Sequence, residues 1–164
     1  TAKAHRRTFI IEVMGNKCGW LATYSAVAGG GNMVIVPEEE YDKEKIINKV
    51  QKLHDEGKSY LVILASEGTG DMQELVKELE ARTGISTRLT VLGLVQRGGS
   101  PTANDRVFAS VLGEQATLAA ISGLHNIAFG MQRGKIVCID LHDAITNKKE
   151  YPEELRHLAE VISL

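Results

Sequence analysis

The sequence predicts a three-layer α/β domain with a mostly parallel β-sheet. Short runs of aliphatic and β-branched residues alternate with longer segments in which apolar residues recur every three or four positions. Strands that alternate with helices in this way form βαβ units with right-handed crossovers. The chain of 164 residues is long enough for one domain with a buried core, and no repeat or low-complexity linker interrupts it.

The first half of the chain supplies strands and the helices between them. Near-continuous apolar runs predict buried strands at residues 8–14, 33–36 and 60–65. A helix of small residues should run from about residue 17 to 28. Asp42 is a suitable N-cap for a second helix that ends at Gly57, and Asp71 can cap a third that ends at Gly84.

A fourth strand is predicted to begin near Arg88. The run Val91–Val95 is interpreted as its buried end, with Arg97 just beyond it. Gly98 and Gly99 then form a turn in which the backbone can approach a ligand closely.

The rest of the chain predicts a long helix, a hairpin and a closing helix. The long helix begins at about Thr102 and should bury one apolar side, formed by Val107, Phe108, Val111, Leu112 and Leu118. Residues 126–131 and 135–139 should form two short strands joined by a glycine turn. An amphipathic helix is expected after Pro152.

Composition excludes several classes of function. The net charge is −2 and charges of both signs are interspersed, so neither a nucleic-acid partner nor a membrane partner is indicated. No apolar run reaches the roughly 20 residues that span a bilayer. The five histidines are not spaced as metal ligands usually are, so no metal site is predicted in this chain.

Two cysteines are too few for a disulfide framework and favour a cytoplasmic, reducing setting. We expect Cys18 to be a small core residue and Cys138 to lie in an apolar setting. The chain opens at Thr1 with no signal peptide and no initiator methionine, so we expect it to be part of a longer protein.

Polar side chains cluster at predicted strand ends. Met14-Gly15-Asn16, Glu67 and Gln96-Arg97 follow strands, where open α/β sheets bind their ligands. Arg7 and Arg88 stand near strand beginnings and should therefore lie at the opposite edge of the sheet. If two chains met, these two arginines of one chain could face the strand-end pocket of the other.

These residue types suit a sugar phosphate. The planar guanidinium fork of arginine donates paired hydrogen bonds to phosphoryl oxygens. A carboxylate such as Glu67 accepts hydrogen bonds from sugar hydroxyls. The alternative is that each arginine simply forms an ion pair on the surface, which is the commoner role for a single arginine.

Several strings of residues together make a family resemblance specific. They are Glu12-Val13-Met14-Gly15, Cys18-Gly19-Trp20, Ala28-Gly29-Gly30, Val36-Pro37-Glu38 and Gln96-Arg97-Gly98-Gly99-Ser100-Pro101. With these strings, the chain resembles the C-terminal half of 6-phosphofructokinases from about His5 to Ile139. The resemblance implies a Rossmann-like fold that binds fructose 6-phosphate.

The resemblance also implies a role for each matching residue. Met14 and Gly15 contact the sugar, and Glu67 binds its hydroxyls. The 6-phosphate is bound by Arg97 of one subunit and by two arginines of its neighbour, Arg7 and Arg88. A homo-oligomer with shared sites, typically a tetramer, is therefore expected.

Some matching positions depart from the family pattern. Asn16 replaces an arginine that supports the transferring phosphoryl group, and Leu94 replaces a histidine that donates to the 6-phosphate. Bacterial members also carry an allosteric nucleotide site, and its matching positions here are Gly30, Asn32, Glu56 and Lys58. Asn32 replaces an acidic residue and Glu56 a basic one, so this effector site is expected to be degraded.

The resemblance implies that the whole enzyme transfers a phosphoryl group from ATP to the 1-hydroxyl of fructose 6-phosphate, with Mg²⁺, in glycolysis. The phosphoryl-donor loop, the catalytic aspartate and the metal ligand belong to the family's N-terminal half, which residues 1–164 do not match. The chain alone should therefore be inactive. Two alternatives stay open: a pyrophosphate-dependent member, and a non-catalytic regulatory subunit that binds sugar phosphate.

Overall fold

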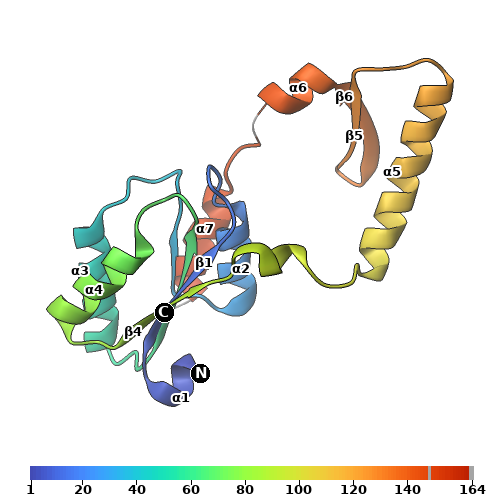
Figure 1. Cartoon of the computed structure of the whole chain (residues 1–164). Coiled ribbons are helices and arrows are strands. Elements are labelled where there is room, and N and C mark those ends of the chain that lie inside the picture. The colour runs from blue at the N-terminus through green and yellow to red at the C-terminus, as the bar shows by residue number, and fades with distance from the viewer. Residues whose placement is uncertain (148, 163–164) are drawn as a thin grey trace. The chain divides into compact units, whose positions relative to one another are not determined.

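The chain divides into two compact units in the computed structural model, which describes residues 1–147 and 149–162 (Figure 1). Unit 1 comprises Thr1–Arg97 together with Tyr151–Leu164, and unit 2 comprises Gly98–Glu150. Unit 1 therefore contains all the side chains that the sequence predicts to bind substrate or effector, and the predicted ligand-facing turn at Gly98 and Gly99 begins unit 2.

Unit 1 is built on a four-stranded parallel sheet with the strand order β2-β3-β1-β4. The central strand β1 (Thr8–Val13) pairs with β3 (Leu61–Ser66) on one side and β4 (Thr87–Val91) on the other. The short strand β2 (Met33–Ile35) pairs with β3 and forms one edge. The near-continuous apolar runs of β1 and β3 fit a sheet that is covered on both faces.

Helices cover both faces of this sheet. Helices α2 (Trp20–Gly29) and α7 (Glu153–Ile162) pack on one face, and α3 (Lys43–Asp55) and α4 (Met72–Thr83) pack on the other (Figure 1). The predicted three-layer α/β architecture is therefore confirmed. A short helix, α1 (Ala2–His5), precedes the first strand and was not predicted.

The core follows the alternation of the strands. Met33 and Ile35 of β2 join the cluster beneath α3 and α4, while Val34 joins the cluster beneath α2 and α7. The predicted helix caps are also present. Asp42 accepts a hydrogen bond from the Lys45 amide at 3.0 Å. Such a cap contributes about 1 kcal/mol to stability.

The fourth strand is shorter than the sequence indicated. β4 ends at Val91, and Gly93–Arg97 form a 3-10 helix, η1, in which Leu94 and Val95 are 78% and 70% exposed. The prediction of a buried strand end at Val91–Val95 is wrong. The chain leaves the sheet because Gly93 takes a φ of +51°, which an extended strand does not contain.

Unit 2 consists of a long helix, a hairpin and a short helix. The helix α5 (Ala103–Ile121) begins at a capping box between Thr102 and Asp105. The antiparallel pair of β5 (Ile127–Gln132) and β6 (Lys135–Asp140) confirms the predicted hairpin. It leads into α6 (Leu141–Thr146), which the sequence did not indicate.

The predicted burial of one side of α5 is wrong. Of the five predicted residues, Val107, Phe108 and Leu118 are exposed and Val111 and Leu112 are only half-buried; Ala119 is the one buried residue of this helix. Unit 2 offers α5 only a two-stranded sheet to pack against, so most of its apolar side chains have no surface to cover them.

Two further expectations concern the cysteines and membrane-spanning helices. Both Cys18 and Cys138 are exposed, so the prediction of a core position for Cys18 is wrong. Cys18 lies in the loop between β1 and α2, outside the layers that form the core. No helix in the described part of the chain is long and apolar enough to cross a membrane.

Candidate functional site

Three strand ends meet at one edge of the unit 1 sheet, which we call the carboxyl edge. The segments that follow β1, β3 and β4 are Met14–Asn16, Glu67 and the η1 helix. The Gln96 side chain accepts a hydrogen bond from the Met14 amide at 3.3 Å, and it donates to the Gly93 carbonyl at 3.2 Å. The Glu67 amide donates to the Val13 carbonyl at 2.8 Å. Four of the predicted substrate-binding residues, Met14, Gly15, Asn16 and Glu67, are thus held at this edge.

Two glycines permit the close approach of these segments. Gly15 has a φ of +140°, and a Cβ there would lie 2.3 Å from the Cys18 carbonyl oxygen. Gly68 has a φ of +81°, and a Cβ there would lie 2.7 Å from the Asn16 side-chain oxygen. A larger residue at position 15 would meet the backbone of its own turn, and one at position 68 would push the loop after β3 away from Asn16 in the turn after β1.

Arg97 ends the η1 helix, in which Gln96 makes the contact with Met14. The guanidinium is exposed, as is Leu94 one turn earlier. This confirms that Arg97 follows β4 on the carboxyl side, although six residues beyond the strand end instead of directly after it. The η1 helix therefore offers a ligand phosphate at this edge one arginine and no histidine.

Carboxylates give the same edge a negative field. Burial raises the pKa of the Glu12 carboxyl, and the charges of Glu67 and Asp71 raise it further. Glu12 belongs to β1, and Glu67 and Asp71 lie in the loop between β3 and α4. Hydroxyl groups of a ligand would therefore meet hydrogen-bond acceptors here, in keeping with the expected role of Glu67.

The other two predicted arginines lie at the opposite edge. Arg7 immediately precedes β1, and Arg88 pairs in register with Phe9 on the neighbouring strand. From Arg7 to Met14 an extended chain covers about 23 Å at about 3.3 Å per residue. The expectation of two opposite edges is confirmed, and one copy of unit 1 does not bring all the predicted residues together.

Arg88 is already engaged at this edge. Its guanidinium forms an ion pair with Glu80 of α4 at 3.3 Å and donates to the Thr87 carbonyl at 3.1 Å. Both charged side chains are about half exposed. An exposed pair of this kind contributes about 0–1 kcal/mol, so a phosphate could displace Glu80 at small cost.

Comparison with known proteins decides the family. The family model described as phosphofructokinase matches residues 1–120. The chain belongs to the phosphofructokinase family. It is 40% identical over 163 residues to the ATP-dependent 6-phosphofructokinase 1 of Clostridium perfringens (strain 13), a match that covers 99% of this chain and 51% of that protein. The ATP-dependent 6-phosphofructokinase of Clostridium botulinum (strain Hall) is 39% identical with the same coverage.

Solved structures agree with this assignment. The chain aligns with phosphofructokinase from Saccharomyces cerevisiae with a TM-score of 0.77 and 29% identity, over 98% of this chain and 22% of that one. A pyrophosphate-dependent phosphofructokinase from Nitrosospira multiformis gives a TM-score of 0.75 at 23% identity, over 90% of this chain and 42% of that one, which shows the shared fold. The chain spans about half the length of the curated phosphofructokinases that it matches.

The positions that match the family's effector site are placed near strand beginnings. Asn32 is buried beside β2, and its side-chain oxygen accepts a hydrogen bond from the Val62 amide at 2.8 Å. Gly30 ends α2 in the left-handed conformation, and Glu56 ends α3 with an exposed pair to Lys52 at 3.7 Å. Lys58 follows just before β3. Asn32 thus has a structural role that its sequence position did not indicate.

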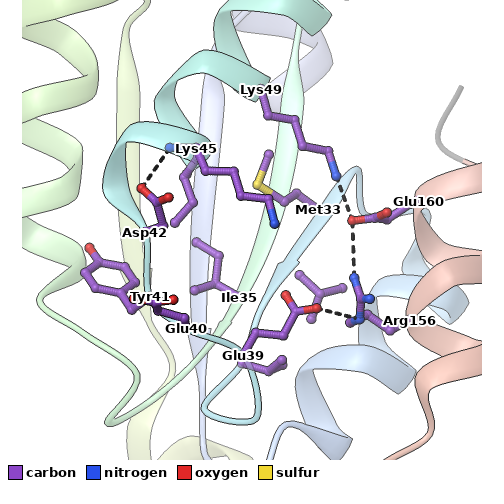
Figure 2. A pocket seen from close by; sticks show the side chains of 13 residues that line it. Met33, Ile35, Glu39, Glu40, Tyr41, Asp42, Lys45, Lys49, Arg156 and Glu160 are labelled. Atoms are coloured by element: carbon purple, nitrogen blue, oxygen red, sulfur yellow. Dashed lines mark hydrogen bonds and ion pairs between the residues drawn. The ribbon is translucent and has the colours of Figure 1, made fainter.

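A cavity of about 280 Å³ lies elsewhere in unit 1, along the β2 edge between α3 and α7 (Figure 2). Four of its charged groups are joined by ion pairs: Lys49 meets Glu160 at 2.7 Å, and Arg156 meets Glu39 at 2.9 Å. None of the predicted phosphofructokinase site residues lines it. The candidate site is therefore the carboxyl edge, where hydrogen bonds hold the segments of Met14, Glu67 and Gln96.

Proposed function

We propose that this chain supplies the fructose 6-phosphate site of an ATP-dependent 6-phosphofructokinase that acts in glycolysis in the cytoplasm. The observation that carries the proposal is the meeting of Met14–Asn16, Glu67 and Gln96-Arg97 at the carboxyl edge. The curated relatives at 39–40% identity are named ATP-dependent 6-phosphofructokinases, which favours ATP over pyrophosphate as the donor.

Each group would then have a definite task. The Met14-Gly15 turn lies against the sugar, where the absence of a Cβ at Gly15 leaves the backbone accessible. The Glu67 carboxylate accepts hydrogen bonds from sugar hydroxyls. The guanidinium of Arg97 holds the 6-phosphate with paired, charge-assisted hydrogen bonds.

The site would be completed by a second copy of the chain. Along the strands, Arg7 lies about 23 Å from Met14, and Arg88, in register with Phe9, lies about 17 Å from it, so neither can share a small ligand with Met14 within one unit 1. In a homo-oligomer, and in a tetramer as the resemblance implies, they would reach the phosphate of a neighbouring site. Arg88 would exchange its exposed pair with Glu80 for the phosphate.

The donor and the metal would be held by another part of the enzyme. Within residues 1–147 and 149–162, no three metal-ligating side chains of His, Cys, Asp or Glu come together. Phosphoryl transfer depends on a positioned donor and on neutralisation of its charge by metal ions. We therefore propose that ATP and Mg²⁺ bind outside residues 1–164 and that this chain alone is inactive.

Allosteric control through the matched effector site would be absent. Glu56 would place a negative charge beside an effector phosphate, and the Asn32 side chain is already bonded to Val62. Both features oppose the binding of a nucleotide effector there.

A second candidate is a regulatory subunit that binds sugar phosphate without catalysis. Asn16 carries no charge where the family pattern has an arginine, and Leu94 is 78% exposed where it has a histidine. Each lost charged contact weakens binding by about 1.5–3 kcal/mol. These two positions are what favour this candidate over a fully active kinase.

Titration calorimetry with fructose 6-phosphate tests the part that both candidates share. We expect binding by the chain, strong weakening by Arg97→Ala and no change by the control Glu39→Ala. Absence of binding at millimolar sugar phosphate, or equal effects of the two variants, would contradict the site assignment.

An assay of the complete protein separates the two candidates. With the remaining half of the enzyme restored, formation of fructose 1,6-bisphosphate is measured with ATP and with pyrophosphate. Product with ATP supports the kinase, product with pyrophosphate alone reverses the choice of donor, and product with neither supports the regulatory subunit.

A further inference from the structure

The cavity of about 280 Å³ along the outer edge of β2 has no task in the proposed function. Because β2 is an edge strand, the main-chain groups that face away from β3 have no neighbouring strand to pair with. Helix α3 forms one wall of the cavity, helix α7 another and the loop after β2 a third (Figure 2). Every lining residue belongs to unit 1, so one compact unit builds the whole cavity.

The floor of this cavity is apolar. Met33 and Ile35 of β2 are 3% and 5% exposed, and Ile46 of α3 packs against the same core cluster. All three residues line the cavity, and Figure 2 shows Met33 and Ile35 lying between the charged side chains of the two helices. An aliphatic group of a ligand would lose its contact with water here, which favours binding.

A network of ion pairs forms the α7 side of the cavity. The Arg156 guanidinium lies 2.9 Å from the carboxylate of Glu39, 3.0 Å from that of Glu153 and 3.5 Å from that of Glu160. Lys49 of α3 joins the network through Glu160 at 2.7 Å. Three carboxylates thus share two cations, so the network carries an excess negative charge. This side of the cavity therefore favours a cationic group of a ligand.

The α3 side of the cavity carries the opposite charge, on Lys45. Its side-chain amine extends into the cavity and forms no ion pair or hydrogen bond with any residue that the structure describes (Figure 2). Asp42 also lines the cavity, but its carboxylate accepts a hydrogen bond from the Lys45 main-chain amide at 3.0 Å as the cap of α3. Glu40 is exposed and adds a further carboxylate to the lining. The cavity therefore offers one unpaired amine and a surplus of carboxylates.

Ligands with a single kind of charge do not match this lining. A small anion would pair with Lys45 but would be repelled by the surplus carboxylates, and a simple amine would be repelled by Lys45. Within residues 1–147 and 149–162, no three side chains of His, Cys, Asp or Glu come together to hold a metal ion. A ligand that carries both charges and an aliphatic group matches the amine, the carboxylates and the apolar floor together.

We propose that this cavity binds a free α-amino acid with an aliphatic side chain. The Lys45 amine donates to the α-carboxylate of the ligand, the Glu39 carboxylate accepts from its α-ammonium group, and its side chain covers Met33 and Ile35. The volume is smaller than that of a typical pocket for a drug-sized molecule, which suits a ligand of this size. The proposal does not depend on the proposed function, because none of the residues of that site lines the cavity.

Titration calorimetry on the chain gives the first test. L-leucine, L-isoleucine, L-valine and L-methionine are titrated separately, and we expect at least one of them to bind saturably at millimolar concentration, with one molecule per chain. The tightest ligand is then compared with the acid that lacks its ammonium group and the amine that lacks its carboxylate, which for leucine are isocaproate and isoamylamine. Each should bind at least tenfold more weakly, because one charged contact is lost. Binding of none of the four amino acids, or an analogue that binds as tightly as the amino acid, overturns the proposal.

The methionines report where the ligand binds. The chain has four, and their methyl groups give separate NMR signals when they are labelled with carbon-13. Met33 lines the cavity, whereas Met14 lies at the carboxyl edge, Met72 in the core beneath α4 and Met131 in unit 2. We expect the amino acid to shift the Met33 signal alone. A shift of the Met14 signal without one of Met33 would place the ligand at the carboxyl edge and overturn the proposal, as would no shift at all.

Two pairs of variants test the charged contacts. Lys45→Met should weaken amino-acid binding at least tenfold, whereas Lys77→Met, which removes an exposed lysine of α4 away from the cavity, should leave it unchanged. Glu39→Gln should also weaken binding at least tenfold. Its control is Glu153→Gln, because Glu153 contacts the same Arg156 nitrogen as Glu39 but does not line the cavity. Equal effects within both pairs overturn the proposal, and unchanged methyl spectra of the ligand-free variants show that each still folds.

Discussion

The Gln96 side chain accepts a hydrogen bond from the Met14 amide at 3.3 Å, although the two residues are 82 positions apart in sequence. The contact joins the turn after β1 to the η1 helix after β4. Since Arg97 follows Gln96 directly, this bond links the part of the proposed site that faces the sugar to the part that faces the phosphate.

Replacement of Gln96 by leucine should lower the affinity of the proposed site for fructose 6-phosphate without unfolding the chain. One neutral hydrogen bond contributes about 0.5–1.5 kcal/mol, which corresponds to a loss of fructose 6-phosphate affinity of about two- to tenfold. Titration calorimetry measures the affinity. The control is Gln51→Leu, which removes an exposed bond to Asp55 far from the carboxyl edge and should leave the affinity unchanged.

Mixing two variants that each bind fructose 6-phosphate poorly should restore binding if the site is shared between copies. Arg97→Ala removes a phosphate-binding arginine from the carboxyl edge of the sheet, and Arg7→Ala removes one from the opposite edge. Neither variant alone should therefore bind fructose 6-phosphate well. In a mixed oligomer, an intact Arg97 edge can meet an intact Arg7 edge. Calorimetry on the mixture should recover a fraction of the wild-type sites, and no recovery would place the complete site within one copy.

Two buried hydroxyls should respond to removal in opposite ways. Ser66 is fully buried, and its hydroxyl has no hydrogen-bond partner among the described residues. Ser66→Ala should therefore raise the free energy of unfolding by about 1 kcal/mol, since an unpaired buried polar group is removed. Urea denaturation measures the change.

Thr23 is the matched comparison, because it is buried to the same extent. Its hydroxyl bonds the Gly19 carbonyl at 2.9 Å and the Tyr151 hydroxyl at 2.6 Å. Burial raises the pKa of Tyr151 to about 12, so that hydroxyl stays protonated and needs a partner. Thr23→Ala should lower stability by about 1–3 kcal/mol. Equal shifts for the two alanine variants would contradict this account.

Neutralisation of Glu12 should stabilise the chain at neutral pH. The pKa of its carboxyl is raised by burial and by the charges of Glu67 and Asp71, so the folded state disfavours the ionised form. Its contribution to stability is therefore most favourable below the ordinary glutamate pKa of about 4.3 and is lost as the pH rises through the raised value.

Glu12→Gln should accordingly give a higher urea midpoint at pH 7 and a difference from the wild type that shrinks toward pH 4. The exposed residue Glu114 provides the control, and Glu114→Gln should leave the midpoint unchanged at both pH values. A benefit of Glu12→Gln that is independent of pH would show that charge is not its cause.

Local patterns in the sequence predicted most of unit 1. Apolar runs identify strands that are buried on both faces, and the side chain of Asp42 identifies a helix start, because both signals act over a few residues. The strand ends that carry Met14 and Glu67 follow from the same runs. Hydrophobicity alone misplaced the end of β4, because a left-handed glycine at position 93 turns an apolar run out of the sheet.

By itself, the sequence determined the three-layer α/β class, the helix caps and the family, through strings that are local and specific. Tertiary structure decided that Gln96 bonds Met14, that Asn32 is held by Val62, and that Arg88 pairs with Glu80. It also decided that the apolar side of α5 is exposed in this chain. A periodic pattern shows that a helix has an apolar side, but only the three-dimensional arrangement shows whether a surface is present to cover it.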